Sequence, residues 1–364
     1  MQKRIIKRKI KKKKKNHKFL FTSLLSITLI WGIIIGIMFS YYLKIPTEIW
    51  EELLPIPTGN KVNIVIESGM NARQAARAFE FGGALESGSP SELAKWFVKF
   101  GIDKRILAGQ YSVVPSTAWN VARQLKTMKP ALIKAMIVPG NDIFKFKDSL
   151  AAQDFNPEKV EAALMNDSNY PEGLKKFFGV MPDDKYYRLA FLQPETYMLV
   201  ERNSDELVNV SSHEWWSRWE KFIKGNNLTS KDVLEASIVA SMVEREVMHD
   251  SEARRVSGVI HNRLRSNMPL QIDATVVYAW RLKGRKLTRV LNKDLEINSP
   301  YNTYKNPGLP PAPICLPGGA SWEASLNPEY NEYFYYVAGR DGYHYFAKTY
   351  SEHLQNIKQV RSSR

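Results

Sequence analysis

Residues 228–247, Leu-Thr-Ser-Lys-Asp-Val-Leu-Glu-Ala-Ser-Ile-Val-Ala-Ser-Met-Val-Glu-Arg-Glu-Val, form the stretch that decides the fold of the second half of the chain. The stretch predicts a helix, because Thr229 can cap its start and Asp232, three residues later, completes a capping-box pattern. Most of the residues that follow are apolar or small, until Glu244-Arg245-Glu246. We therefore expect a largely buried helix with two carboxylates at its C-terminal end.

The two carboxylates should leave this helix on different sides, since successive helical residues are about 100° apart. Glu244 shares its face with the small residues Ser237, Ala240 and Ser241, which should leave an open space in front of the carboxylate. Glu246 points to the apolar side, made of Val239, Met242 and Val243. Burial at the end of such a helix raises the pKa of a carboxylate, which suits a general acid. The alternative is that all three charged residues form a solvated helix end.

The N-terminus has the pattern of a membrane anchor. Residues 1–18 contain eleven Lys or Arg and no acid, and residues 19–43 contain no charge. Those 25 residues are long enough to cross a hydrocarbon core of about 30 Å. The positive-inside rule then predicts a cytoplasmic basic tail (1–18), one transmembrane helix (19–43) and an extracytoplasmic remainder. A cleaved signal peptide is the alternative.

Charge and cysteine content narrow the function classes. The net charge of the chain is +15, of which eleven lie in the tail, so the folded part does not have the charge of a nucleic-acid-binding protein. The single Cys315 excludes an intramolecular disulfide. The six His show no ligand spacing, so we expect no metal site, and no Gly-rich phosphate loop is present.

The extramembrane part divides into three segments. Residues 44–60, with Pro46, Pro55, Pro57 and Gly59, read as a linker. Residues 61–130 alternate strand and helix patterns, which predicts a small α/β module. Residues 131–364 form a larger α+β region, with the motifs concentrated in 229–364. The Pro- and Gly-rich loop 307–319 needs partners for its backbone polar groups, and such loops are often functional.

Several multi-residue motifs of this region follow one another in a fixed order. They are Val243-Glu-Arg-Glu246, Asn262-Arg-Leu264, Met268-Pro-Leu-Gln-Ile-Asp273, Ser299-Pro-Tyr-Asn-Thr-Tyr304, Gly308-Leu-Pro-Pro311, Ser325-Leu-Asn-Pro328 and His344-Tyr-Phe346. From about residue 61 to the end, the chain resembles the endolytic murein transglycosylases, a bacterial family with one N-terminal membrane span. The resemblance implies a LysM-like module at 61–130 and a catalytic domain at 131–364.

The resemblance also implies a site. The first Glu of the family's Glu-x-Glu pair is the essential acid, and it falls on Glu244. Four residues are candidates to hold the glycan, to stabilise an oxocarbenium-like charge, or to structure their own loops: Gln271, Asp273, Asn302 and Tyr304. Glu246 and Arg263 are candidates for a supporting role, and Glu246 is the second choice for the acid.

The reaction implied is cleavage of peptidoglycan strands after N-acetylmuramic acid to give 1,6-anhydro ends, trimming or terminating nascent strands without a cofactor. The implied partners are the glycan strands, the cell membrane and penicillin-binding synthases, with no nucleic acid. The chain departs from the family pattern twice: Leu189-Ala190 stands where the family has Glu-Gly, and Pro139-Gly140 lacks the usual intervening Glu. We expect neither departure to touch Glu244, and both to bear on the rim of the cleft and on substrate preference.

Two other function classes compete with this one. A non-catalytic scaffold would use the LysM-like module to bind glycan and the remainder to contact cell-wall synthases. A pyridoxal-phosphate lyase acting on a small amine would need a buried Lys for the Schiff base, and no Lys stands out near the motifs.

Overall fold

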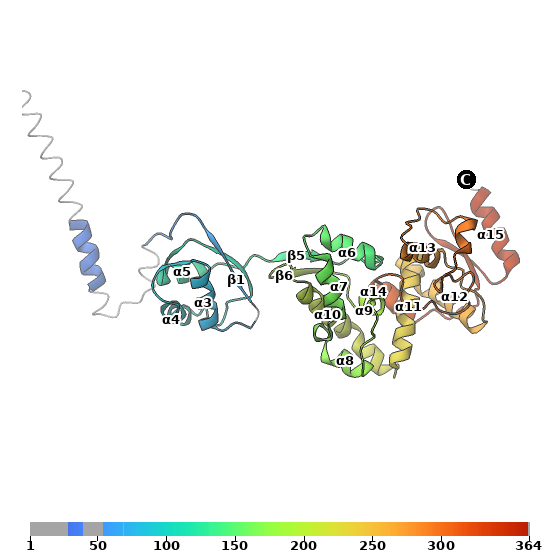
Figure 1. Cartoon of the computed structure of the whole chain (residues 1–364), viewed down its shortest axis with the longest axis horizontal. Helices are drawn as coiled ribbons and strands as arrows, with labels where there is room; N and C mark the ends of the chain where they lie inside the picture. The colour runs from blue at the N-terminus through green and yellow to red at the C-terminus, as the bar shows by residue number, and fades with distance from the viewer. Residues whose placement is uncertain (1–27, 39–53, 68, 363–364) are drawn as a thin grey trace, which may run out of the picture. The chain divides into compact units, whose positions relative to one another are not determined.

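The computed structural model describes residues 28–38, 54–67 and 69–362 (Figure 1). The predicted basic tail 1–18 lies outside these residues, and so does most of the predicted span 19–43, of which only 28–38 is described and is helical. Within the described ranges, no helix has both the length and the apolar character needed to cross a membrane. The described chain separates into two compact units, one holding residues up to 107 with 111–129, the other holding 108–110 with 130–362. Both units mix helices and strands, which confirms the α+β class.

The N-terminal unit is a small α/β structure around one core. Its elements are β1 (Val62–Ile66), α3 (Ala72–Phe81), β2 (Leu85–Ser87), α4 (Pro90–Lys99), β3 (Gly109–Val113, which runs across the division), β4 (Ser116–Thr117) and α5 (Ala118–Leu125). Strand β1 pairs with β3, and β2 pairs with β4 in parallel. Phe79 and Phe97 meet edge to face at 6.0 Å in the middle of this core. These aromatic side chains are core residues.

The C-terminal unit begins with a helical layer and a two-stranded sheet. Its first elements are β5 (Ile133–Met136), α6 (Ile143–Ala151), α7 (Pro157–Met165), α8 (Glu172–Phe178), α9 (Lys185–Ala190), β6 (Thr196–Leu199) and α10 (Ser204–Gly225). Strands β5 and β6 are antiparallel, with Ile133 opposite Leu199. The core face of α10 contains three buried tryptophans, Trp215, Trp216 and Trp219.

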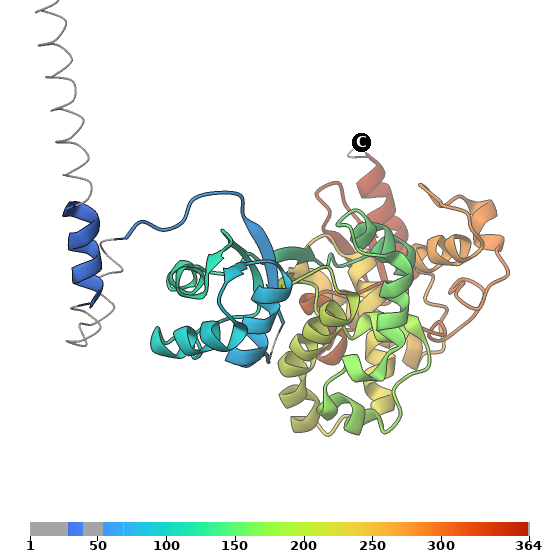
Figure 2. The same cartoon turned by 60° about the vertical axis from the view of Figure 1, so that its left-hand side comes forward.

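The rest of the unit follows α11 (Ser230–Glu246). It contains α12 (Ala253–Arg265), α13 (Asp273–Leu282), α14 (Gly319–Leu326), β7 (Tyr335–Ala338), β8 (His344–Ala347) and α15 (Tyr350–Ser362), with short 3-10 turns at Asp167–Asn169, Asp250–Glu252 and Asn292–Glu296. Strands β7 and β8 form an antiparallel hairpin, with Tyr335 opposite Ala347. Helix α15 has no buried residue and contacts the hairpin, and it stands at the outside of the unit in Figure 1 and Figure 2.

Helix α11 contributes residues to two hydrophobic clusters, and its contacts with both clusters fix the position of its C-terminal end. Val233, Ala236 and Ala240 belong to the cluster with the α10 tryptophans, whereas Ile238, Val239, Met242 and Val243 belong to the cluster with α12 and α13. The helix also contacts α9, α12, α13 and α14 (Figure 1). A helix buried on nearly every side is held in a fixed position, and so are the two carboxylates at its C-terminal end.

Candidate active site

Glu244 lies at the end of a helix whose start is firmly fixed. Thr229 caps α11 and Asp232 completes the capping box, as predicted. In the last turn, the Glu244 carboxylate is half-buried, and its Oε2 accepts hydrogen bonds from the Gly318 N–H at 2.8 Å and from the Ser321 hydroxyl at 2.7 Å. Burial raises the pKa of Glu244, and the two hydrogen bonds work against that rise. Oε1 makes no hydrogen bond to any residue that the structure describes, which leaves this oxygen free for a substrate.

Both donors come from the first turn of α14. Gly318 is the N-cap residue of this helix and Ser321 is its third residue, so Oε2 lies where the first backbone N–H groups of a helix point. A Cβ on Gly318 would stand 3.2 Å from Oε2, which is a tight contact. The glycine therefore permits the close approach of the carboxylate to the start of α14.

Gly140 borders the other oxygen. Its φ of +72° is in the left-handed region that favours glycine, and a Cβ there would lie 3.8 Å from Glu244 Oε1 and 3.6 Å from Arg245 Nη1. Arg245 Nη1 donates to the Gly140 carbonyl at 3.2 Å, and the Gly140 N–H donates to Leu316. The Pro139-Gly140 segment, one of the two departures from the family pattern, is thus part of the immediate surroundings of Glu244. The expectation that this departure does not touch Glu244 is therefore wrong.

The prediction of an open space in front of Glu244, on the helix face with the small residues, is wrong. Ser237, Ala240 and Ser241 are completely buried. The Ser241 hydroxyl accepts from the Ile314 N–H at 3.0 Å, and α14 packs along this face. Small side chains here allow α14 and the 312–318 segment to approach α11, and this approach is what brings Gly318 and Ser321 to Glu244.

The other departure, Leu189-Ala190, does not lie on a rim. Both residues are buried in the cluster that contains the α10 tryptophans, and the Ala190 carbonyl accepts from Trp322 Nε1 at 3.2 Å. Leu189 and Ala190 therefore pack in the core beneath α14. The expectation that this departure from the family pattern alters the rim of a cleft is wrong.

Glu246 faces a second polar cluster. Its Oε2 accepts from the Tyr336 hydroxyl at 3.0 Å. Burial raises the pKa of Glu246 to about 7, helped by the charge of Asp273 and opposed by Tyr336, Arg245 and Arg263. As predicted, Glu246 leaves the helix away from Glu244 and packs against other elements, among them strand β7.

Arg263 is buried, and its guanidinium donates hydrogen bonds to backbone carbonyls of the loops around Glu246. Its Nε donates to the Phe334 carbonyl at 2.6 Å, and its Nη1 donates to the Leu270 carbonyl at 2.8 Å and the Pro269 carbonyl at 3.2 Å. These bonds tie α12 to the start of β7 and to the segment before α13. The guanidinium therefore fixes backbone, which agrees with the supporting role predicted for it.

The four residues predicted as candidates to hold the glycan have different surroundings in the structure. The Tyr304 hydroxyl donates to Asp273 Oδ1 at 2.6 Å, and the exposed Gln271 accepts from Arg263 Nη1 at 3.4 Å. Asn302 is fully buried: its Nδ2 donates to the Leu295 and Ile297 carbonyls, and its Oδ1 accepts from the Tyr304 N–H. Of the two roles predicted for Asn302, the structure supports loop structuring, because its side chain holds the 295–304 loop. Gln271, Asp273 and Tyr304 form a polar group near Glu246.

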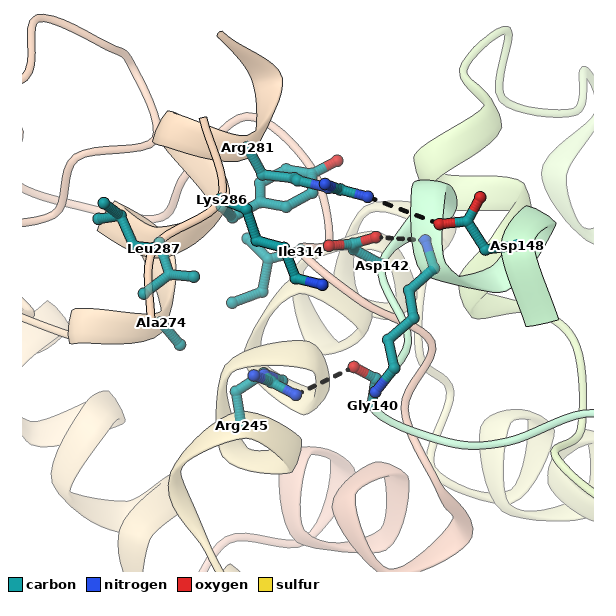
Figure 3. Close-up of a pocket in the computed structure, with 12 residues that line it drawn as sticks. Gly140, Asp142, Asp148, Arg245, Ala274, Arg281, Lys286, Leu287 and Ile314 are labelled. Carbon is teal, nitrogen blue, oxygen red and sulfur yellow. Dashed lines mark hydrogen bonds and ion pairs between the residues drawn. The ribbon is translucent and has the colours of Figure 1, made fainter. Parts of the chain in front are cut away.

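A pocket of about 280 Å³ opens beside this helix end, between α6, α13 and the loop after α13. In Figure 3, Arg281 and Lys286 come from α13 and the loop after it, and Arg281 faces Asp148, whereas Arg245 comes from the end of α11 and faces Gly140. Glu244 does not line this pocket, but Gly140 and Arg245 do, and Gly140 is the residue next to Oε1. A substrate bound at Glu244 therefore has this pocket as its neighbour.

Ser321, Gly318 and Arg245 were not predicted as parts of the site. The signal in the sequence was the Gly pair after the Pro-rich loop followed by a Ser at the third helical position, which is a pattern of helix starts. In the described part of the chain, no group of three His, Cys, Asp or Glu is placed to hold a metal ion.

Comparison with known proteins identifies a family that matches most of this chain. The YceG-like family matches residues 64–359. A protein named endolytic murein transglycosylase from Bacillus subtilis is 29% identical over 325 residues, which cover 86% of this chain and 89% of the relative. One of the same name from Streptococcus pneumoniae is 27% identical over 345 residues, and the alignment spans 61% of its length. A crystal structure of a yceG-like protein from Listeria monocytogenes matches with a TM-score of 0.52 at 25% identity, covering 82% of this chain and 99% of the other.

Proposed function

Because the chain belongs to the YceG-like family, we propose that it is an endolytic murein transglycosylase, a lyase that cleaves the glycan strands of peptidoglycan. The observation that supports this most is the half-buried Glu244 carboxylate, held through one oxygen by Gly318 and Ser321 and open at the other. A carboxyl group with a raised pKa and a free oxygen suits a group that first gives and then takes a proton.

In the proposed reaction, Glu244 protonates the glycosidic oxygen that follows N-acetylmuramic acid. The bond between that oxygen and C1 breaks, and positive charge develops at C1. The C6 hydroxyl of the same sugar then bonds to C1 and gives its proton to the Glu244 carboxylate. The products are a free hydroxyl on the next sugar and a 1,6-anhydro end, so no water is consumed and Glu244 returns to its starting state.

The site's two fixed donors assist the first step, in which Glu244 gives its proton. The Gly318 N–H and the Ser321 hydroxyl stabilise the carboxylate that remains after the proton has been given, because both bond to the charged form. Glu246, Tyr336 and Arg263 keep the helix end, the β7 strand and the loop before α13 together. Gln271, Asp273 and Tyr304 remain candidates for contact with more distant sugars.

The cellular setting is part of the same proposal. Residues 19–43 anchor the protein in the cell membrane, with 1–18 in the cytoplasm and the catalytic domain 131–364 outside. The 61–130 module acts as a LysM-like glycan-binding domain, and the protein works beside penicillin-binding synthases. The support is the charge pattern of the N-terminus, the compact α/β unit at 54–129 and the likeness to the named relatives.

The test is a digestion of purified glycan strands by the full chain in detergent, with the ends identified by mass spectrometry. Anhydro ends support the lytic reaction. Reducing ends would contradict it and indicate a hydrolase, in which Asp250, the acid whose charge acts on Glu244, would be the candidate second carboxylate. Intact strands that nevertheless bind the protein would support the non-catalytic scaffold instead.

A further inference from the structure

The pocket beside Glu244 is lined by more cationic than acidic residues. Its volume is about 280 Å³, and four of its lining residues are cations while two are acids. These six residues are Lys145, Arg245, Arg281, Lys286, Asp142 and Asp148. Saccharide hydroxyls do not require cations, so the excess of positive charge indicates an anionic group in the ligand.

Both acids of the pocket are already engaged. Asp142 caps α6, where its Oδ1 accepts from the Lys145 N–H at 2.7 Å. Asp148 pairs with Arg281 Nη2 at 3.7 Å (Figure 3). The remaining cations have no carboxylate partner in the described ranges: Arg245 donates to a backbone carbonyl, and the ammonium groups of Lys145 and Lys286 make no ion pair there.

The two lysines come from separate walls of the pocket. Lys145 is on α6, and Lys286 is on the loop after α13, and both are exposed. The surface between them includes the apolar residues Ala274, Val277, Leu287 and Ile314. A ligand that carries both carboxylates and small methyl groups would satisfy the two kinds of surface together.

The position of the pocket relates it to the cleavage point. Gly140 lines the pocket and is also the neighbour of Glu244 Oε1, with a Cβ there at 3.8 Å from that oxygen. A muramic acid residue placed for proton transfer from Glu244 carries its peptide on the lactyl group, a few bonds from the reacting C1. The peptide is the part of the substrate that has carboxylates and alanine methyl groups.

We propose that this pocket binds the stem peptide of the muramic acid residue at the cleavage point, with Lys145 and Lys286 pairing with its carboxylates. The inference rests on the proposed transglycosylase function and extends it, because it makes the enzyme selective for strands that still carry their peptides. Lys145 and Lys286 are then specificity-determining residues and have no part in the proton transfer.

The test compares two substrates with the full chain in detergent: glycan strands with stem peptides, and the same strands after an amidase has removed the peptides. The variants are Lys145→Ala/Lys286→Ala and, as a matched control, Lys176→Ala/Lys358→Ala, which removes two exposed lysines that do not line the pocket. Since an exposed ion pair contributes about 0.2–1 kcal/mol, we expect the pocket variant to lose roughly fivefold in kcat/KM on peptide-bearing strands, mainly through KM. On stripped strands it should match the wild type, and the control should match it on both.

An equal loss on both substrates would overturn the proposal, since the lysines would then act on the sugars or on the shape of the site. Full activity of the pocket variant on peptide-bearing strands would also overturn it. These outcomes differ from failure of the transglycosylase function itself, in which the wild type would give no anhydro ends on either substrate and the peptide proposal would fall with it.

Discussion

Glu244 and Glu246 are two residues apart on one helix end, yet their surroundings differ in kind. Glu244 is held by a backbone N–H and a hydroxyl from the first turn of α14, keeps one oxygen free and borders a pocket through Gly140. Glu246 accepts from the half-buried Tyr336 and lies among Arg263 and Asp273. Burial raises the pKa of both carboxyls, and it raises that of Glu246 to about 7. A raised pKa therefore does not identify the acid by itself, and the free oxygen and the neighbouring pocket favour Glu244 for chemistry and Glu246 for structure.

The largest effect should come from Glu244→Gln. The amide cannot give or take the proton, and general acid–base groups contribute about 10² to 10⁴-fold, so the rate of anhydro-end formation should fall by that factor. The melting temperature should stay near that of the wild type, because the amide oxygen can still accept from Gly318 and Ser321. Glu235→Gln, an exposed position on the same helix, is the control and should change neither quantity. Near-normal activity in Glu244→Gln would remove Glu244 from the mechanism.

Arg263→Ala should affect mainly the stability of the Glu246 region, in contrast to Glu244→Gln, which should affect mainly activity. The change leaves three carbonyls without a charged donor, in a residue that is only 9% exposed, so unfolding should become easier by about 2–4 kcal/mol. Denaturant unfolding measures this, with the exposed Arg254→Ala as the control. A fully stable variant with reduced activity would mean that Arg263 serves the reaction directly.

The pH dependence of stability should show the titration of Glu246. Its folded pKa of about 7 is above its ordinary value of 4.5, so the folded state holds the proton more tightly. The contribution to stability is then complete below pH about 4.5 and disappears as the pH rises through about 7, a loss of roughly 1–3 kcal/mol. Glu246→Gln, which stays neutral, should lack this part of the decline between pH 4.5 and 7, whereas Glu235→Gln should keep it. Identical pH curves for wild type and Glu246→Gln would contradict the assignment.

Ser321→Ala should give the smallest effect. Loss of one hydrogen bond of about 1 kcal/mol to the carboxylate should lower the rate by up to about tenfold. Because that bond stabilises the charged form of Glu244, its removal should also move the Glu244 limb of the pH–rate profile to higher pH. Ser325→Ala, one turn further along α14 and bonded to a backbone carbonyl, should leave the profile in place. A shift to lower pH in Ser321→Ala would show that the hydroxyl does not act on Glu244.

The sequence carried local information well and long-range information poorly. Thr229 and Asp232 predicted the start of α11, and the spacing of Glu244 and Glu246 predicted their divergence, because both depend on residues within a few positions. The partners of Glu244 are 74 and 77 residues away, so periodicity could not reveal them. The hollow expected at Ser237, Ala240 and Ser241 failed for the same reason, since a helical pattern shows which face is small but not which element covers it. The sequence left two roles open for Asn302, glycan contact and loop structuring, and only its burial and hydrogen bonds show that its amide holds a loop.

The most direct test of the account is one digestion of peptide-bearing glycan strands by three proteins: wild type, Glu244→Gln and Glu246→Gln, each shown to be folded. The ends are counted by mass spectrometry under single-turnover conditions. We expect anhydro ends from the wild type and from Glu246→Gln, with the latter slower by less than about tenfold, and a loss of about 10² to 10⁴-fold in Glu244→Gln. Anhydro ends that persist in Glu244→Gln and vanish in Glu246→Gln would contradict the account and assign the proton transfer to the other carboxylate.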